Sequence, residues 1–156
     1  MILRPDYIKA IEPFIDSPLV KILAGVRRSG KSTILEMLIE ELKNRGISAD
    51  SIIERKYNTP DYDVFTTKNM FDDLKNAIKN KGRCYLFLDE IQEINGWEKA
   101  INTLMEDFDV DIYITGSNSK LMSSEISTYL TGRYVLIPVY TLSFREYLIF
   151  KNRDFS

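Results

Sequence analysis

The stretch that decides the fold is Gly25-Val-Arg-Arg-Ser-Gly-Lys-Ser32, which fits the pattern G-x-x-x-x-G-K-[ST] at every position. Glycines at those places allow a tight turn in which successive backbone N–H groups point inward, toward an anion. An apolar run, 19–24, precedes the stretch, and an amphipathic segment, 32–45, follows it. The stretch would therefore join a strand to a helix N-terminus, where unpaired N–H donors favour a phosphate group.

The residues of this loop have distinct expected roles. We expect Lys31 to contact the β- and γ-phosphates of a nucleotide and the Ser32 hydroxyl to bind Mg²⁺. Arg27 and Arg28 could contact a phosphate or a neighbouring subunit, or could lie in solvent. The residues expected to bind the nucleotide are Gly25, Arg27, Arg28, Ser29, Gly30, Lys31, Ser32 and Thr33.

A second apolar run, 84–88, ends in two adjacent carboxylates, Asp89 and Glu90. We expect Asp89 to hold Mg²⁺, as a Walker-B aspartate does. Glu90 is one residue further on and points elsewhere, so it could polarise an attacking water as general base. A strand that simply ends in a polar loop is the alternative, but the loop at 25–32 favours the catalytic interpretation.

Two further segments offer catalytic candidates beside Lys31 and Glu90. Thr115, Ser117 and Asn118 follow the apolar run 110–114, and one of them could sense the γ-phosphate. An ordinary turn or helix cap is the alternative there. Arg133 could stabilise transition-state charge, in its own chain or from a neighbour, or it could form a structural ion pair.

Short apolar runs alternate with helical patterns along the chain. The expected strands are 19–24, 84–88, 110–114 and 134–137, with a more polar candidate at 51–57 that would lie nearer an edge. The expected helices are 6–14, 32–45, one entered near Thr67, one over 97–108 and one that begins at Ser143. This alternation predicts an α/β fold of three layers, with a doubly wound, mainly parallel sheet of the P-loop NTPase type. Ligands of such sheets bind at the carboxyl ends of the strands.

Composition excludes several classes of protein. A chain of 156 residues that is 44% hydrophobic suits a single domain with a real core. The chain has no histidine, which excludes Ser-His-Asp and Cys-His catalysis and every histidine-ligated metal site. Its one cysteine, Cys84, excludes an internal disulfide and favours a reducing cytoplasm.

Charge and hydropathy limit the partners. A net charge of −2 does not indicate a broad nucleic-acid-binding surface. The apolar runs are far shorter than the roughly 18 residues that a membrane span needs. The chain contains neither an NKxD sequence, which reads guanine, nor the LSGGQ segment of transporter ATPases, so ATP is expected rather than GTP.

Taken together, these segments resemble a prokaryotic group of AAA-type ATPases, over essentially the whole chain. The Asp-Glu-Ile-Gln sequence at 89–92 and Leu-Thr-Gly-Arg at 130–133 are the most specific. The segments that carry the resemblance are 25–32, 86–92 with Trp97 and Glu98, 114–118, 130–133 and 142–147.

The resemblance implies Mg-ATP as ligand, with Asp89 at the metal, Glu90 at the water and the sensor within 115–118. It also implies that the sensor strand lies between the strands that lead to 25 and to 89. Members of this group continue into a helical lid and a C-terminal domain, so we expect residues 1–156 to be a single ATPase core without them. AAA-type cores often form rings, so homo-oligomers are possible.

The expected function is an ATPase core that couples ATP hydrolysis to a conformational change, with a protein partner that the sequence does not identify. Two alternatives stay open. One is a P-loop phosphotransferase acting on a small molecule, which would share the loop and the sheet. The other is a nucleotide-dependent interaction module without turnover.

Overall fold

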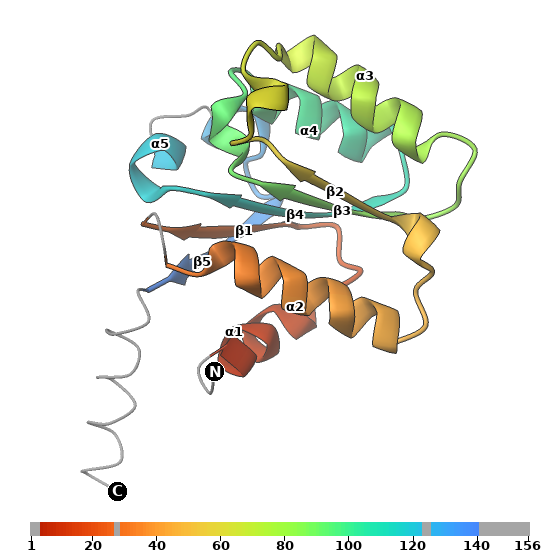
Figure 1. The fold of residues 1–156 in the computed structure, drawn as a ribbon, viewed down its shortest axis with the longest axis vertical. Helices are drawn as coiled ribbons and strands as arrows, with labels where there is room; N and C mark the ends of the chain where they lie inside the picture. Colours follow the sequence, from red (N-terminus) through yellow and green to blue (C-terminus); the bar gives the residue numbers. More distant parts are fainter. Residues whose placement is uncertain (1–3, 27–28, 123–125, 141–156) are drawn as a thin grey trace, which may run out of the picture.

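The computed structural model describes residues 4–26, 29–122 and 126–140, and these build one parallel sheet between two layers of helices (Figure 1). The five strands of the described residues lie in the order β2-β3-β4-β1-β5, and every neighbouring pair is parallel. Their bounds are β1 Val20–Gly25, β2 Ile52–Lys56, β3 Cys84–Asp89, β4 Val110–Gly116 and β5 Tyr134–Val139.

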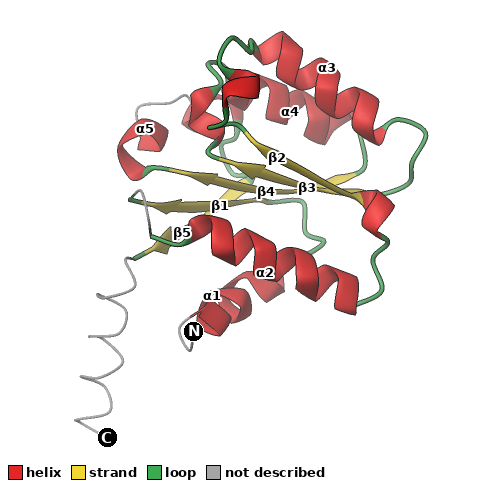
Figure 2. Ribbon diagram, viewed as in Figure 1, coloured by secondary structure: helices red, strands yellow, loops and turns green. Residues whose placement is uncertain are grey.

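Helices cover both faces of this sheet (Figure 2). One face carries α1 (Arg4–Ile11) and α2 (Lys31–Asn44), and the other carries α3 (Thr67–Ile78) and α4 (Trp97–Asp107). Two shorter helices, α5 (Asn118–Met122) and α6 (Ile126–Tyr129), follow β4. Short 3-10 turns lie at Glu12–Phe14, Ala49–Ser51, Pro60–Tyr62 and Ile91–Glu93.

The core divides into two clusters because side chains alternate between the faces of a strand. Along β1, Val20, Ile22 and Ala24 pack with the α3 and α4 side, whereas Leu23 packs with the α1 and α2 side. The central strands are buried at nearly every position, which explains their near-continuous apolar sequence.

These elements confirm the predicted fold class. β4, the strand that leads to 115, lies between β1 and β3, as the resemblance implied, and the polar segment β2 lies at an edge. The N-terminal α-helix is shorter than expected, since Pro13 has no N–H to continue it and the chain passes into a 3-10 turn. The helix expected from Ser143 lies outside the described residues.

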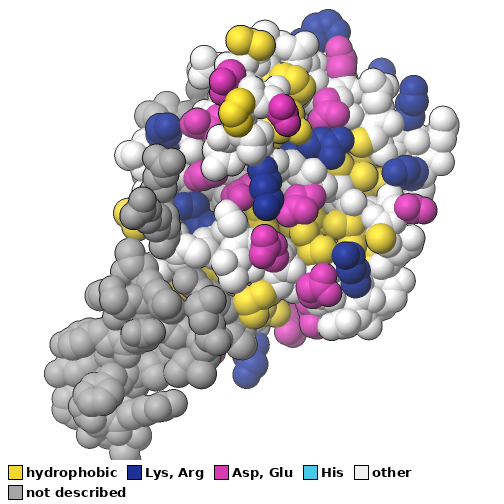
Figure 3. Space-filling view, in the orientation of Figure 1, with side chains coloured by type: hydrophobic (Ala, Val, Ile, Leu, Met, Phe, Trp, Pro, Cys, Tyr) yellow, Lys and Arg dark blue, Asp and Glu magenta, His cyan; other side chains and the backbone are white. Residues whose placement is uncertain are grey.

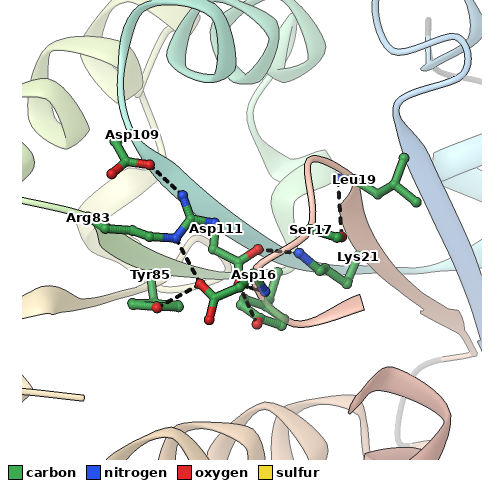
Figure 4. A network of polar contacts seen from close by, with 9 residues as sticks. Asp16, Ser17, Leu19, Lys21, Arg83, Tyr85, Asp109 and Asp111 are labelled. Atoms are coloured by element: carbon green, nitrogen blue, oxygen red, sulfur yellow. Dashed lines mark hydrogen bonds and ion pairs between the residues drawn. The ribbon is translucent and has the colours of Figure 1, made fainter. Parts of the chain in front are cut away.

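A network of charged side chains around the buried pair Lys21 and Asp111 ties the amino ends of the strands together (Figure 4). Lys21 of β1 is fully buried and donates to Asp111 of β4, which also accepts from the Tyr113 hydroxyl. The Asp16 N–H donates to the second oxygen of Asp111, and Arg83 donates to Asp16. The network fixes the segment that enters β1, at the end of the sheet opposite to residues 25 and 89.

Among the described residues, no helix has both the length and the apolar character that crossing a bilayer requires.

Candidate nucleotide-binding site

The loop after β1 is shaped by its glycines. Gly25 pairs in register with Val139, and a Cβ at Gly25 would collide with the Val139 carbonyl and lie 2.9 Å from Ser29 Oγ. Gly30 has a φ of 92°, a left-handed conformation that glycine adopts without strain, and it immediately precedes α2. The loop therefore leads the chain directly from the carboxyl end of β1 into the N-terminus of a 14-residue helix.

Lys31, the first residue of α2, is folded back over this loop. Its Nζ donates to the carbonyl oxygens of Gly25 at 2.9 Å and Val26 at 3.0 Å, and it lies 4.0 Å from Glu90 Oε1. Burial lowers the pKa of Lys31, while the charges of Glu90 and Asp89 act in the opposite direction. A positive charge, only 5% exposed, is thus held between the loop and the acidic strand end.

Ser32 and Asp89 bring the two predicted motifs into contact. Ser32 Oγ donates a 2.6 Å hydrogen bond to Asp89 Oδ2, and the Asp89 residue is buried at the carboxyl end of β3. A hydroxyl and a carboxylate side by side are hard oxygen donors of the type that Mg²⁺ binds. In the parts of the chain that the structure describes, no three acidic, cysteine or histidine side chains are grouped to hold a metal. A magnesium ion that takes one carboxylate together with substrate phosphates needs no such group.

Thr115 holds the two neighbouring acids in place. Its hydroxyl is fully buried, donates to Asp89 Oδ1 and accepts from the backbone N–H of Glu90 at 2.9 Å. Glu90 has a φ of 54°, a conformation that is unusual for a residue with a side chain. This backbone turn directs the side chains of Asp89 and Glu90 to different places, as their proposed roles require.

A cavity of about 810 Å³ opens between these elements, at the carboxyl end of the sheet. Its walls come from the loop after β1, the start of α2, and the segments that follow β2, β3 and β4. The lining residues are Val26, Gly30, Lys31, Ser32, Asn58, Glu90, Gln92, Glu93, Ser117, Asn118, Ser119 and Lys120.

Six of the fourteen predicted site residues line this cavity, namely Gly30, Lys31, Ser32, Glu90, Ser117 and Asn118. Ser117 and Asn118 line it, whereas Thr115 is turned away to Asp89 and Glu90. The Ser29 side chain is buried, and half-buried Thr33 is not among the lining residues. The predictions for Arg27 and Arg28 lie outside the described residues.

Arg133 does not line the cavity of its own chain. Its backbone carbonyl accepts from Val20 N, which places Arg133 at the amino end of β1, roughly 16 Å of strand away from Gly25. Its guanidinium donates to the Tyr129 carbonyl at 3.1 Å and lies 3.8 Å from Glu106 Oε1. These contacts favour the structural alternative.

Sequence reasoning missed several cavity residues. Asn58 follows β2, and the rule that ligands bind at the carboxyl ends of strands would have found it. Gln92 is the last residue of the Asp-Glu-Ile-Gln sequence at 89–92, but the sequence analysis gave it no role. Lys120 Nζ donates to Glu93 Oε2 at 3.2 Å, and both residues line the cavity. The two residues are 27 positions apart, so no local sequence pattern indicates that they pair.

A parallel sheet with a glycine loop, a buried lysine and an acidic strand end defines a protein of the P-loop nucleotide-binding class. A family model described as "AAA domain" matches residues 17–148. The chain therefore belongs to the AAA domain family.

Two relatives from distant organisms align with this chain. A protein of Haemophilus influenzae, recorded as uncharacterized, is 38% identical over 156 residues, which are 99% of this chain and 39% of that protein. The uncharacterized protein MJ1544 of Methanocaldococcus jannaschii is 37% identical over 134 residues, 85% of this chain and 29% of that protein. The chain thus spans well under half the length of both relatives.

Solved structures share the fold. A DNA polymerase III gamma subunit-related protein from Thermotoga maritima superposes with a TM-score of 0.60 at 14% identity, covering 92% of this chain and 48% of that one. AMPPCP-bound DnaA from Aquifex aeolicus superposes with a TM-score of 0.56 at 17% identity, covering 95% of this chain and 49% of the DnaA chain. At these identities the likeness shows the α/β fold of AAA-type ATPases alone.

Proposed function

We propose that this chain is the core of an AAA-type ATPase that binds Mg-ATP and hydrolyses it. The observation that carries the proposal is that Lys31, Ser32 and Glu90 line one cavity and that Asp89 is hydrogen-bonded to Ser32 beside it. Each of these groups has the chemistry that one part of the reaction needs, and they come from two places far apart in the sequence, the start of α2 and the carboxyl end of β3.

The loop would bind the phosphates of ATP. Its backbone N–H groups and the N-terminus of α2 supply partial positive charge, and Lys31 supplies a full one. Lys31 is already desolvated, so it would exchange the carbonyls of Gly25 and Val26 for phosphate oxygens without a further loss of water. ATP is supported by the AMPPCP in the DnaA structure, a neighbour in fold.

Ser32 and Asp89 would hold magnesium, which would neutralise charge that develops on the phosphates. Thr115 would keep Asp89 turned toward Ser32 through its hydrogen bond to the other carboxylate oxygen. Ser117 and Asn118 remain the candidates to sense the γ-phosphate, since both line the cavity.

Glu90 would act as general base. A water attacks the γ-phosphorus, Glu90 accepts its proton, and the bond between the γ-phosphorus and the bridging oxygen breaks. The electron pair of that bond stays on ADP, and the products are ADP and inorganic phosphate. Lys31 Nζ lies 4.0 Å from Glu90 Oε1, so the proposed base stands beside the residue that would bind the γ-phosphate.

The partners are proposals as well. We propose that hydrolysis drives a conformational change passed to a protein partner, and that the core works in the cytoplasm, where Cys84, a free and buried thiol, stays reduced. Assembly into a homo-oligomer would suit the family. Basic and acidic side chains are interspersed over the face in Figure 3, which gives nucleic-acid binding by this portion no support.

Calorimetric titration with Mg-ATP tests the proposal, together with an assay of phosphate release. We expect Lys31→Ala to weaken ATP binding roughly a hundredfold, because one or two charge-assisted hydrogen bonds are lost. Lys43→Ala, on the exposed side of the same helix, is the matched control and should bind like the wild type. Equal affinity of the wild type and Lys31→Ala would refute the site. Binding without phosphate release would favour the interaction module instead.

A further inference from the structure

Lys120 carries a positive charge into the cavity, and the proposed reaction does not yet use it. The residue lies in α5, the short helix that follows β4, and its Nζ donates to Glu93 Oε2 at 3.2 Å. The Leu121 N–H donates to the Ser117 carbonyl at 2.9 Å, so the candidate sensor segment leads directly into this helix. Of the described residues that line the cavity, Lys31 and Lys120 are the basic ones.

The ion pair of Lys120 and Glu93 lies close to the proposed base. The Glu93 N–H donates to the Glu90 carbonyl at 3.2 Å, so both acids belong to one tight turn after β3. Glu90 Oε1 is 4.0 Å from the Nζ of Lys31. A γ-phosphate bound by Lys31 and facing Glu90 would therefore lie in the part of the cavity that Glu93 and Lys120 also line.

This ion pair is of a kind that opens readily. The side chain of Lys120 is 61% exposed and that of Glu93 is 39% exposed. An exposed ion pair adds little stability, because water screens the charges and two long side chains must be held in one geometry. The ammonium group of a lysine stands on a flexible stem, and a phosphate oxygen accepts the same charge-assisted hydrogen bond as a carboxylate oxygen.

The proposed reaction has a use for such a cation. Phosphoryl transfer places negative charge on the phosphate oxygens, and positively charged groups stabilise that charge. Arg133 was the sequence candidate for this role, but it does not line the cavity and lies beside Glu106. Lys120 supplies a positive charge on the cavity wall within the same chain.

We propose that Lys120 is a second phosphate-binding lysine of this cavity: its ammonium group contacts the γ-phosphate of ATP, and Glu93 competes with that phosphate for the lysine. The inference rests on the proposed function, in which Lys31 binds the same phosphate. Because ADP has no γ-phosphate, Lys120 stays with Glu93 when ADP is bound. Lys120 thus makes the cavity prefer ATP to ADP.

The test measures the affinity of the chain for Mg-AMPPCP and for Mg-ADP by calorimetric titration. AMPPCP carries a γ-phosphate that hydrolysis does not remove, so binding is measured without turnover. The variants are Lys120→Met, which removes the charge, Lys120→Arg, which keeps it, and Glu93→Gln, which removes the competing carboxylate. Lys75→Met, at an exposed position of α3, is the control. Circular dichroism checks that each variant is folded.

We expect Lys120→Met to bind AMPPCP roughly tenfold more weakly, because a charge-assisted hydrogen bond to the γ-phosphate is lost. Its affinity for ADP should stay within about twofold of the wild type, since ADP lacks the group that the lysine contacts. Lys120→Arg should keep the preference for AMPPCP to within about threefold. Glu93→Gln should bind AMPPCP about threefold more tightly, because no carboxylate then competes for the lysine.

Equal losses of AMPPCP and ADP affinity in Lys120→Met would overturn the inference, because Lys120 would then not act on the γ-phosphate. Weaker AMPPCP binding by Glu93→Gln would overturn it as well, since Glu93 would then position the lysine instead of competing for it. If the wild type and Lys31→Ala bind Mg-ATP equally, the proposed function itself fails. If Lys31→Ala loses ATP binding but Lys120→Met prefers AMPPCP to ADP as the wild type does, only the role of Lys120 fails.

Discussion

Ser32 and Asp89, 57 positions apart in the sequence, are joined by a hydrogen bond of 2.6 Å from the serine hydroxyl to the aspartate carboxylate. One is in the first turn of α2 and the other is the last residue of β3. The contact joins the glycine loop to the acidic strand end, which are the two motifs on which the proposed ATPase depends.

Ser32→Ala should reduce the effect of magnesium on ATP binding. The substitution removes one oxygen donor and leaves Asp89 in place, so we expect the gain in ATP affinity on adding Mg²⁺ to shrink roughly tenfold. ATP binding in the presence of a chelator should stay close to that of the wild type. Calorimetric titrations with and without magnesium measure both values, and an undiminished magnesium effect would argue against Ser32 as a ligand.

The buried pair of Lys21 and Asp111 gives a prediction about stability. Removing one partner leaves a buried charge without compensation, so Asp111→Ala should lower the free energy of unfolding by about 3–5 kcal/mol. The double variant Lys21→Met with Asp111→Leu should recover most of that loss, because an apolar pair has no charge to desolvate. Urea unfolding followed by circular dichroism measures both. A double variant less stable than Asp111→Ala would contradict this account.

Asp16 gives a prediction about pH. Burial alone would raise the pKa of Asp16, but hydrogen bonds from Arg83 and Tyr85 outweigh it and lower the pKa below its usual 3.8. A carboxyl group with a lowered folded-state pKa stabilises the fold above its unfolded pKa and loses that effect as the pH falls through the folded pKa. Asp16→Asn should therefore be less stable than the wild type above about pH 5, and the difference should shrink below pH 3.8. Unfolding curves of both proteins, measured from about pH 2.5 to about pH 7, check this prediction. If the difference in the free energy of unfolding between them stayed constant over this range, Asp16 would not act in this way.

Most of the fold could be predicted from the sequence because a parallel sheet covered on both faces needs continuous apolar strands. The segments 19–24, 84–88, 110–114 and 134–137 all became strands, with ends displaced by one or two residues. The place of β4 between β1 and β3 came from the family resemblance, since a local pattern does not encode which strands are neighbours. Lys21 and Asp111 interrupt two of the runs, and only the fold shows that they neutralise each other.

A site residue could be predicted where a single motif indicates its role, but not where its position depends on contacts between segments far apart in the sequence. The loop at 25–32 and the acids at 89–90 could be read locally. Thr115 was one of three candidates for the sensor, and its hydroxyl is directed to Asp89 and Glu90, because the register of β4 beside β3 decides where it points. Arg133 was a candidate from its motif, yet it lies at the amino end of β5, and only the strand direction reveals this.

The central claim is that Glu90 activates the water that attacks ATP bound by Lys31 and Ser32. Phosphate release and ATP affinity of Glu90→Gln, measured beside the wild type, test it most directly. The account predicts an ATP affinity within about threefold of the wild type and hydrolysis at least about a hundredfold slower. Hydrolysis by Glu90→Gln at the rate of the wild type would contradict it.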